Sequence, residues 1–382
     1  MLINVKDLQN ICKTILVAVD KADNKAANLE LVAENNKLEL NVTNTEYYVS
    51  VKVDCVCTES FRAVVKAQKF LSLVADLTVE DITIEAEASS ITITAGKSHY
   101  TLPLIFENDK LVELPAITLS NKTIEMPISL DVLSSIVNIN SKELTKIENK
   151  DKATLSEWQR GYYITEEGCL TFTTGACLNG FKLEKPIKML LNERIVKLFK
   201  LFNSDVAFSF GYDALANGTV QNKVVFETEN IYLAAIITND DVILSKLLGP
   251  YSATKGYINA NYSNKVVVST TSLNKAITRL VNFSKTEQEY KNFSTGTITL
   301  EPSTDTSTAT LIITDKDDNV EAINIENTSI IDPSYKMTLN LNDLKLVLDV
   351  CKEDFVTLNF GNHQSIVVSR GTICNLIPEL TV

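Results

Sequence analysis

The sequence predicts an α+β protein built from three repeats of one unit, each with two amphipathic helices and several antiparallel strands. Three observations lead to this class. A helical stripe of apolar residues recurs at fairly even spacing along the chain, and a repeat of this kind decides the architecture. Alternating strand patterns follow the stripes, and at 382 residues the chain is too long for a single core. The six stripes begin near Val5, Lys66, Ser129, Asn192, Ser272 and Asn340.

Each helix is predicted from apolar residues spaced three and four apart. In the first, Val5, Leu8, Ile11 and Ile15 share one face, while Lys13 lies outside it. The same spacing continues in the others: Phe70, Leu71, Val74, Leu77; Leu130, Leu133, Ile136, Val137; Ile195, Leu198, Phe199, Phe202; Leu273, Ala276, Ile277, Leu280; and Leu341, Leu344, Val347, Leu348, Cys351. Ser129 is expected to cap the third helix.

The strands are predicted from alternating apolar residues. Leu29–Ala33 and Leu38–Val42 alternate on either side of Asn35-Asn36, which predicts a hairpin. A further strand is expected from Val49 to Cys57. Each third of the chain closes on a similar strand, namely Tyr100–Leu104, Tyr232–Ile236 and Asn375–Pro378. Because helices and strands come in blocks, the sheets are expected to be antiparallel.

These repeats predict three domains, at residues 1–120, 121–252 and 253–382. The segment Glu113–Lys122 lacks periodicity and is expected to link the first two. The Gly249-Pro250-Tyr251-Ser252 cluster is a helix and strand breaker, and we expect it to end the second domain.

Composition predicts a globular protein of a reducing compartment. Seven cysteines form no regular framework, and no apolar run has the length of a membrane span. The chain begins with a strand leading into a helix rather than a signal peptide. We therefore expect a cytoplasmic location and no membrane partner.

No catalytic or metal motif is evident. His99 and His363 are the only histidines, and neither accompanies a nucleophile. Cys55 and Cys57 have no second cysteine pair, which argues against a metal site, and they share a face with neighbouring valines, so they are expected to be core thiols. We expect no cofactor and no enzymatic activity.

One acidic segment matches part of a calcium-binding loop. Asp315, Asp317 and Asn319 have the required spacing, but Val320 stands where the loop needs glycine and the flanks resemble strands. A solvated hairpin turn is the preferred interpretation.

Basic residues concentrate on the polar faces of the repeated helices although the net charge is −12. Lined up on one surface, they would present a mildly positive lining to phosphates. The alternative is that they only keep the helices soluble. The residues expected to face nucleic acid are Lys13, Lys66, Lys69, Arg194, Lys197, Lys200, Lys275, Arg279 and Lys345.

With these features, the chain resembles the bacterial DNA polymerase III β subunit, the sliding clamp, in a divergent version such as a phage or plasmid one. The resemblance rests on the threefold repeat, on the length, and on local matches at Arg160–Ile164, Thr173–Leu178, Asp240–Pro250 and Asn375–Leu380. Gly175-Ala176-Cys177 stands where the family has Asp-Gly-His-Arg, and the chain ends with the additional Thr381-Val382.

The resemblance implies a head-to-tail homodimeric ring around double-stranded DNA, held by topology, with a replicative DNA polymerase and a clamp loader as partners. It also implies an apolar pocket for partner peptides between the second and third domains. The matching pocket positions are Ile164, Thr174, Gly175, Leu178, Lys246, Leu247, Ile377, Pro378 and Leu380. The matching dimer-interface positions are Tyr100, Leu102 and Phe283.

The function expected from this resemblance is that of a non-enzymatic processivity factor. One alternative is an interaction scaffold with the clamp fold that does not encircle DNA. A second alternative, an enzyme on a repeated α+β scaffold, would need a cluster of titratable groups, and the sequence nominates none.

Overall fold

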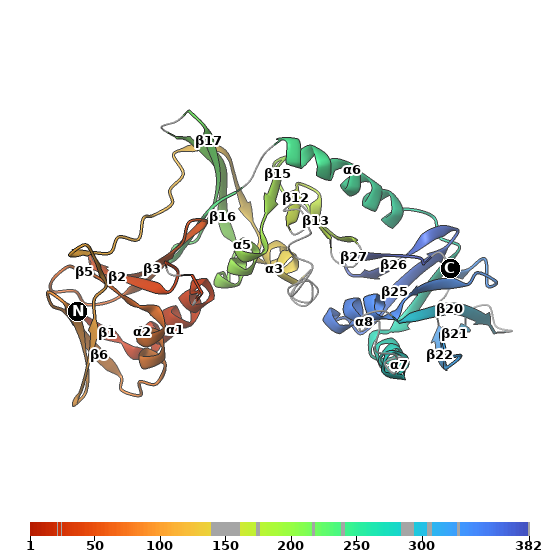
Figure 1. Ribbon diagram of the computed structural model, residues 1–382, viewed down its shortest axis with the longest axis horizontal. Coiled ribbons are helices and arrows are strands. Elements are labelled where there is room, and N and C mark those ends of the chain that lie inside the picture. Colours follow the sequence, from red (N-terminus) through yellow and green to blue (C-terminus); the bar gives the residue numbers. More distant parts are fainter. Residues whose placement is uncertain are drawn as a thin grey trace. The chain divides into compact units, whose positions relative to one another are not determined.

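The computed structural model describes residues 1–20, 22–23, 25–138, 161–172, 176–215, 218–237, 241–283, 294–303, 308–326 and 329–380. It is an α+β protein with antiparallel sheets, as the sequence predicts (Figure 1). The chain forms two compact units, unit 1 with Met1–Ser134 and Arg194–Thr238, and unit 2 with Ser135–Glu193 and Asn239–Val382. Both units take part of the predicted middle domain, and the three-domain division stays a prediction.

Unit 1 contains an eight-stranded, a four-stranded and a two-stranded sheet together with its helices. Its elements are β1 (Leu2–Asn4), α1 (Val5–Ile15), the 3-10 helix η1 (Leu16–Ala18), β2 (Asn28–Glu34), β3 (Lys37–Thr43), β4 (Tyr47–Asp54), β5 (Phe61–Lys66), α2 (Ala67–Ala75), β6 (Asp81–Ala86), β7 (Ser90–Ala95), β8 (Ser98–Pro103), β9 (Phe106–Glu107), β10 (Lys110–Leu111), β11 (Asn121–Ile128), the 3-10 helix η3 (Phe199–Leu201), β16 (Val206–Ala214), β17 (Val220–Glu227) and β18 (Ile231–Ile236). Helices α3 (Leu130–Asn138) and α5 (Glu193–Leu198) lie where the chain passes between the units.

One eight-stranded sheet joins distant parts of unit 1. Its order is β11-β16-β17-β18-β4-β3-β2-β5, so β18 pairs with β4 and Leu233 lies opposite Val49. The predicted hairpin between β2 and β3 is confirmed, because Asn35 and Asn36 both have positive φ, as a tight hairpin turn requires. A second sheet has the order β1-β6-β7-β8 and leaves β8 at its edge.

Unit 2 is built around a nine-stranded sheet. Its elements are β12 (Tyr162–Thr165), β13 (Gly168–Phe172), β14 (Ala176–Gly180), β15 (Lys188–Leu191), α6 (Asp241–Ile258), β19 (Asn264–Ser269), α7 (Thr270–Phe283), β20 (Thr295–Pro302), β21 (Thr308–Asp315), β22 (Val320–Glu326), β23 (Ser329–Ile330), β24 (Met337–Asn340), α8 (Leu341–Val350), β25 (Phe355–Gly361), β26 (His363–Arg370) and β27 (Ile373–Pro378). The sheet order is β15-β12-β13-β14-β27-β26-β25-β19-β23, and the smaller sheet has the order β22-β21-β20-β24.

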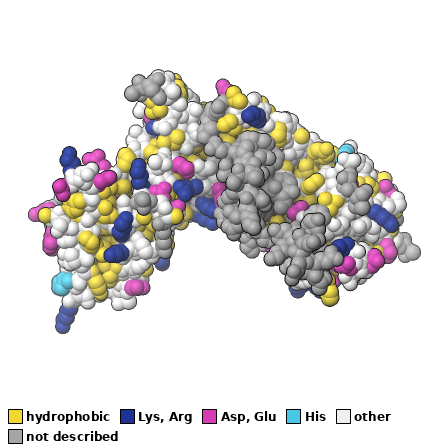
Figure 2. Space-filling model, in the orientation of Figure 1, with side chains coloured by type: hydrophobic (Ala, Val, Ile, Leu, Met, Phe, Trp, Pro, Cys, Tyr) yellow, Lys and Arg dark blue, Asp and Glu magenta, His cyan; other side chains and the backbone are white. Residues whose placement is uncertain are grey.

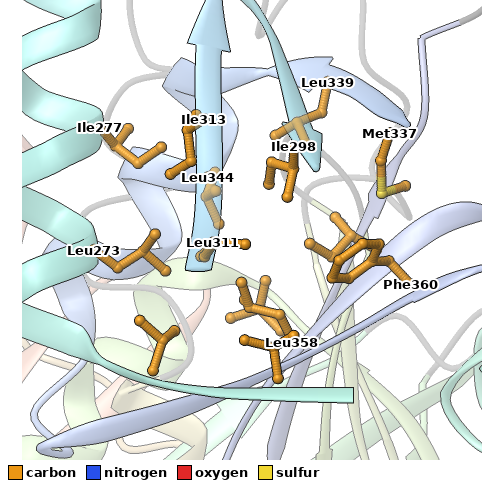
Figure 3. Close-up of a cluster of buried hydrophobic side chains, with 14 of the residues drawn as sticks. Leu273, Ile277, Ile298, Leu311, Ile313, Met337, Leu339, Leu344, Leu358 and Phe360 are labelled. Atoms are coloured by element: carbon orange, nitrogen blue, oxygen red, sulfur yellow. The ribbon is translucent and has the colours of Figure 1, made fainter. Parts of the chain in front are cut away.

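The two faces of the nine-stranded sheet carry different cores. Leu376 packs with Leu178 and Leu247 under α6, whereas its neighbour Ile377 belongs to the core beneath α7 and α8. Figure 3 shows that second core, in which Leu273 and Ile277 of α7 meet Leu311, Leu344 and Leu358. The alternation of β27 between these cores explains why apolar residues follow one another along it.

All six predicted helices are present, with starts that differ by up to two residues. The third begins as expected, because Ser129 Oγ accepts a hydrogen bond from the N–H of Val132 at 3.3 Å. The fifth, α7, begins at Thr270 rather than near Ser272. The fourth, α5, is short and continues into η3.

The predicted breaker at Gly249–Ser252 is wrong, because α6 runs through it without ending. Proline removes one backbone hydrogen bond from a helix interior. In α6 that loss is offset by packing: Leu244, Leu247 and Tyr251 are buried at helical spacing, and the Tyr251 hydroxyl lies 3.1 Å from Thr165 Oγ1.

The predicted burial of Cys55 and Cys57 is also wrong. Strand β4 ends at Asp54, so neither cysteine lies in it, and both are only partly buried. The backbone N–H of Cys57 bonds to Asn36 Oδ1 at 3.0 Å, which draws this segment over the hairpin turn instead of into the core.

Candidate nucleic-acid interface and partner site

In unit 1, α1 and α2 pack side by side and expose lysines on their outer faces. Asn4 begins α1 by accepting the Lys6 N–H at 3.0 Å, and Leu8 of α1 is fully buried. Gln9 of α1 donates to the carbonyls of Val74 at 3.0 Å and Leu77 at 2.9 Å, which satisfies groups at the end of α2. The two helices are therefore held together by hydrogen bonds as well as by apolar packing.

The predicted lysines of unit 1 lie on the surface. Lys13, Lys69 and Lys200 are exposed and make no ion pair with any residue that the structure describes. Lys66 is the last residue of β5 and directly precedes α2, and its Nζ donates to Asn28 Oδ1 at 2.9 Å. Lys197 is exposed on α5.

Arg194 differs from these lysines because acidic residues hold it. Its Nη2 lies 2.9 Å from Asp20 Oδ2, and its Nη1 lies 3.9 Å from Asp23 Oδ2. Burial alone would raise the pKa of Asp23, but backbone N–H donors at Ala26 and Lys25, together with the Arg194 charge, hold that pKa below its ordinary value. The two carboxylates therefore offset the positive charge of the arginine.

In unit 2 the predicted basic residues lie on α7 and α8, which pack against each other. Lys275 and Arg279 are exposed one turn apart on α7, and Lys345 is partly buried on α8. Arg279 pairs with Glu321 of β22, and Lys345 pairs with Asp349 at 2.8 Å. Sequence reasoning placed the cations on the right helices but missed the Glu321 partner.

The described residues that were predicted to line a partner pocket lie in unit 2, on β12, β14, β27, α6 and the segment that follows β27. Strand β14 pairs with β27, with Leu178 opposite Cys374. Of the predicted residues, Ile164, Leu247 and Ile377 are at most 2% exposed, so their side chains pack in the interior.

The other pocket positions are more accessible. Lys246 and Pro378 are exposed, Leu380 is partly exposed, and Leu178 is buried with 8% exposure beneath α6. Thr174 and Gly175 lie outside the described residues. The pocket therefore stays a prediction, supported by the positions that reach the surface.

The predicted dimer-interface residues lie at exposed places. Tyr100 is 37% exposed and Leu102 is partly exposed on the edge strand β8, and Phe283 at the end of α7 is 66% exposed. An edge strand carries unpaired backbone groups that can add a further strand. These three residues are therefore accessible to another chain.

Charges of both signs are mixed over the molecule. Figure 2 shows basic and acidic side chains interspersed on the face in view.

Among the described residues, no cluster of three or more His, Cys, Asp and Glu could hold a metal ion. The Asp315 segment forms the expected hairpin turn, in which Asp315 Oδ1 accepts the Asp317 and Asn319 N–H groups, each at 2.9 Å.

Among the described residues, no helix is both long and apolar enough to cross a bilayer.

The two histidines make local contacts. His99 is exposed, and its Nδ1 lies 3.0 Å from Thr94 Oγ1. The ring of His363 packs edge-on against the ring of Tyr262.

Comparison with known proteins decides the fold. Residues 5–111 match the family model for the DNA polymerase III beta subunit, N-terminal domain. The β subunit of Streptococcus pyogenes DNA polymerase is 16% identical and has a TM-score of 0.75, and the match covers 100% of this chain and 99% of that one. This chain has the fold of the DNA polymerase III β subunit.

Two further structures with this fold carry bound molecules. A sliding clamp of Pseudomonas aeruginosa bound to griselimycin is 13% identical with a TM-score of 0.76, and the Helicobacter pylori β clamp bound to a DNA ligase peptide is 16% identical with a TM-score of 0.71. Each match covers 100% of this chain and 99% of the other. No curated protein matches the sequence of this chain.

Proposed function

We propose that this chain is a DNA sliding clamp, a processivity factor that encircles duplex DNA and tethers a replicative polymerase. The observation that carries the proposal is the likeness to β subunits over the full length of both chains. In this proposal the chain has three clamp domains, at residues 1–120, 121–252 and 253–382, and two copies join head to tail into a ring.

The exposed helix lysines suit weak contacts with a duplex. Lys13 and Lys69 lie on the paired helices α1 and α2, and Lys275 lies on the pair α7 and α8. Contacts with phosphates are independent of sequence and weaken with salt, so a few of them can orient a ring without fixing it in place. A ring that holds DNA by topology needs no high affinity, which is compatible with the net charge of −12.

The dimer would form through the edge of β8 in one protomer and the end of α7 in its partner. Tyr100 and Leu102 offer an apolar surface beside the free edge of β8, and Phe283 offers a large exposed ring. An apolar core with a polar rim is usual in homodimer interfaces.

Partner proteins would bind by a short peptide segment. The Helicobacter pylori clamp holds a DNA ligase peptide, and Lys246, Pro378 and Leu380 give this chain an accessible surface at the predicted pocket. A replicative DNA polymerase and a clamp loader are the partners we propose. Tethering raises the effective concentration of the polymerase at the primer end, so rebinding becomes intramolecular.

The proposal assigns no catalytic role to any residue. The alternative, a clamp-fold scaffold that does not encircle DNA, is not favoured, because the similar structures are described as sliding clamps.

Topological linkage to circular DNA is the property that tests the proposal. The protein is diluted until protomers separate and is then reconcentrated with nicked circular plasmid, so that rings close around DNA without a loader. Gel filtration at about 0.5 M salt, where phosphate contacts are largely screened, should show protein eluting with the circle and released when a restriction enzyme linearises it. Equal release from circular and linear DNA would refute the proposal.

A further inference from the structure

Two cysteines lie on one face of a short extended segment that follows β4 in unit 1. Val56 forms an isolated antiparallel bridge with Leu2, in which the N–H of each residue donates to the carbonyl of the other, at 2.9 and 2.8 Å. On the other edge of the segment, the N–H of Cys55 donates to the Asn36 carbonyl at 2.9 Å, and the N–H of Cys57 donates to Asn36 Oδ1 at 3.0 Å. Because the N–H groups point to alternate edges, as in an extended chain, Cys55 and Cys57 share a face and Val56 lies on the other.

Both thiols of this pair are free and only partly buried. Burial raises the pKa of Cys55, and the charge of the neighbouring Cys57 thiolate raises it further, whereas the Met1 ammonium lowers it. The two sulfurs are therefore close enough for their charges to repel each other. A cation bound between them removes that repulsion.

A third sulfur side chain lies beside the pair. Met1 follows the register of the bridge and lies opposite Cys57, one position outside the bridged residues. Residues opposite each other in an antiparallel pair point to the same face. Met1 is 9% exposed, and its backbone is fixed by hydrogen bonds to the carbonyl and the N–H of Ile84, at 2.8 and 2.9 Å. The face thus carries two thiols and a thioether, which are all soft ligands.

The spacing of the two cysteines excludes a disulfide in this conformation. Residues two apart in an extended chain have their β-carbons about 6.6 Å apart, because each residue advances the strand by about 3.3 Å. A disulfide needs β-carbons about 3.5–4.5 Å apart. The pair can close a disulfide only if the hydrogen bonds that hold Cys55 and Cys57 to Asn36 are disturbed.

The same spacing suits a cation held in line between two sulfurs. Such a cation spans about twice the roughly 2.3 Å of a metal–thiolate bond, or about 4.6 Å between the sulfurs. Each sulfur reaches that separation by leaning inward by about 1 Å from its β-carbon. Hydrogen bonds already fix the backbone of Cys55, Val56 and Cys57, so little order has to be gained when the cation binds.

We infer that Cys55 and Cys57 bind a soft monovalent cation of the copper(I) type between their thiolates, beside the thioether of Met1. The inference goes beyond the proposed function and does not depend on it. Binding exchanges the two S–H protons for two sulfur–metal bonds, so both protons pass to solvent and no electron is transferred.

The ligands decide which class of cation fits. Thiolate and thioether sulfurs select Cu(I), whereas magnesium and calcium take oxygen ligands. Zinc in a structural site takes four ligands. Within the described part of the chain, no group of three or more His, Cys, Asp and Glu comes together to supply them. A two-coordinate soft cation needs only the pair.

The experiment titrates the reduced full-length chain with Ag(I), which shares the preference of Cu(I) for sulfur and keeps its oxidation state in air. Titration calorimetry in a chloride-free buffer measures the stoichiometry and the affinity. Cu(I) is then titrated under argon in competition with a coloured Cu(I) chelator. Both cations should give one tight equivalent per chain, separate from any weaker binding to the remaining thiols.

The variants separate a site from mere thiol content. Cys55→Ser and Cys57→Ser should each lose the tight equivalent, by more than the roughly tenfold to hundredfold that the loss of an outer-shell partner costs. Val56→Cys/Cys57→Ser keeps two neighbouring thiols but places them on opposite faces, and it should lose the equivalent as well. Val56 is 58% exposed, so this change leaves the core intact.

Cys351→Ser is the matched control. Cys351 is also partly buried, and no cysteine stands two positions from it. This variant should bind as tightly as the wild type, with circular dichroism showing that every variant is folded. Tight binding that persists in Val56→Cys/Cys57→Ser or in either single variant of the pair would overturn the inference, and so would its loss in Cys351→Ser.

X-ray absorption of the Cu(I)-loaded chain identifies the ligands. A first shell of sulfur alone is expected, with two atoms if the thiolates act alone and three if the Met1 thioether joins them. A shell that contains nitrogen or oxygen in place of one thiolate would contradict the site.

Thiol counting tests the extended geometry separately. After treatment with diamide, single chains isolated on a denaturing gel should still give all seven thiols. A loss of two thiols that Cys55→Ser abolishes would show that the segment bends enough to close a disulfide. That result would overturn the geometry on which the cation site rests.

Discussion

Replacement of Gly296 by alanine should disturb the core that supports α7 and α8. A β-carbon added at Gly296 would lie 2.6 Å from Cγ and Cδ1 of Leu341, well inside the 3.4–4 Å of ordinary contact. Leu341 is fully buried at the start of α8, so it has little room to move. Overpacking of this kind costs about 1–3 kcal/mol in free energy of unfolding.

A double-mutant cycle makes this prediction specific. Leu341→Ala alone should cost about 2–5 kcal/mol, because it leaves a cavity in the core. In the Gly296→Ala/Leu341→Ala protein the new methyl group enters that cavity, so the double variant should be no less stable than Leu341→Ala alone. The interaction free energy between the two substitutions should therefore equal the cost of Gly296→Ala alone, about 1–3 kcal/mol.

The assay is urea unfolding followed by circular dichroism, with hydrogen exchange of β20 and α8 amides as the local readout. Exchange reports the opening of this part of the chain even where the whole protein does not unfold in one step. Costs that add to within about 0.5 kcal/mol would refute the packing described here, because non-contacting residues behave in that way.

Three further predictions concern other elements. Asp213→Asn should lower stability at pH 7 by about 1–3 kcal/mol, because a 2.6 Å bond from Lys223 lowers the pKa of Asp213 in the folded protein. The wild type should lose this contribution as pH falls through that lowered pKa, so a variant whose stability falls as steeply as the wild type's below pH 5 would contradict it. Gly256→Ala should stabilise the protein by up to about 1 kcal/mol and raise its melting temperature, since outside the chain neighbours and the helix's own backbone nothing lies within 4 Å of the added carbon in α6. Calorimetry showing a loss would argue against an open helix face there. Leu102→Asp should give monomers in analytical ultracentrifugation while the circular dichroism spectrum stays native, whereas an unchanged dimer would place the interface away from β8.

The sequence was sufficient for features that depend on neighbouring residues. Apolar spacing predicted the helices, and Asn35-Asn36 predicted a turn whose residues have positive φ. Asp349, four residues after Lys345, is an ion-pair partner that helical spacing alone could have indicated.

Features that depend on tertiary packing were not predictable in this way. The Gly249-Pro250 pair is a local breaker, yet burial of Leu247 and Tyr251 against the sheet keeps α6 helical. The pairing of Arg279 with Glu321 requires the register of β22 against β21, which places a residue 42 positions away beside α7.

The segments proposed to form the partner site lie together in the structure, and the site itself stays a prediction. Pairing of β14 with β27 brings distant segments together, as the resemblance implies. Which of their side chains reach the surface depends on the alternation of β27 between two cores. Ile377 packs in the core beneath α7 and α8 whereas Pro378 is exposed, and a single sequence does not contain that information.

Electron microscopy of the purified protein tests the central claim most directly. Negatively stained particles should be closed rings with a central hole wide enough for duplex DNA, about twice the 10–12 Å diameter of a single helix. Isolated protomers, at the concentrations used to test retention on circular DNA, would contradict encirclement. They would leave the β-subunit fold in place and make the scaffold alternative the better account.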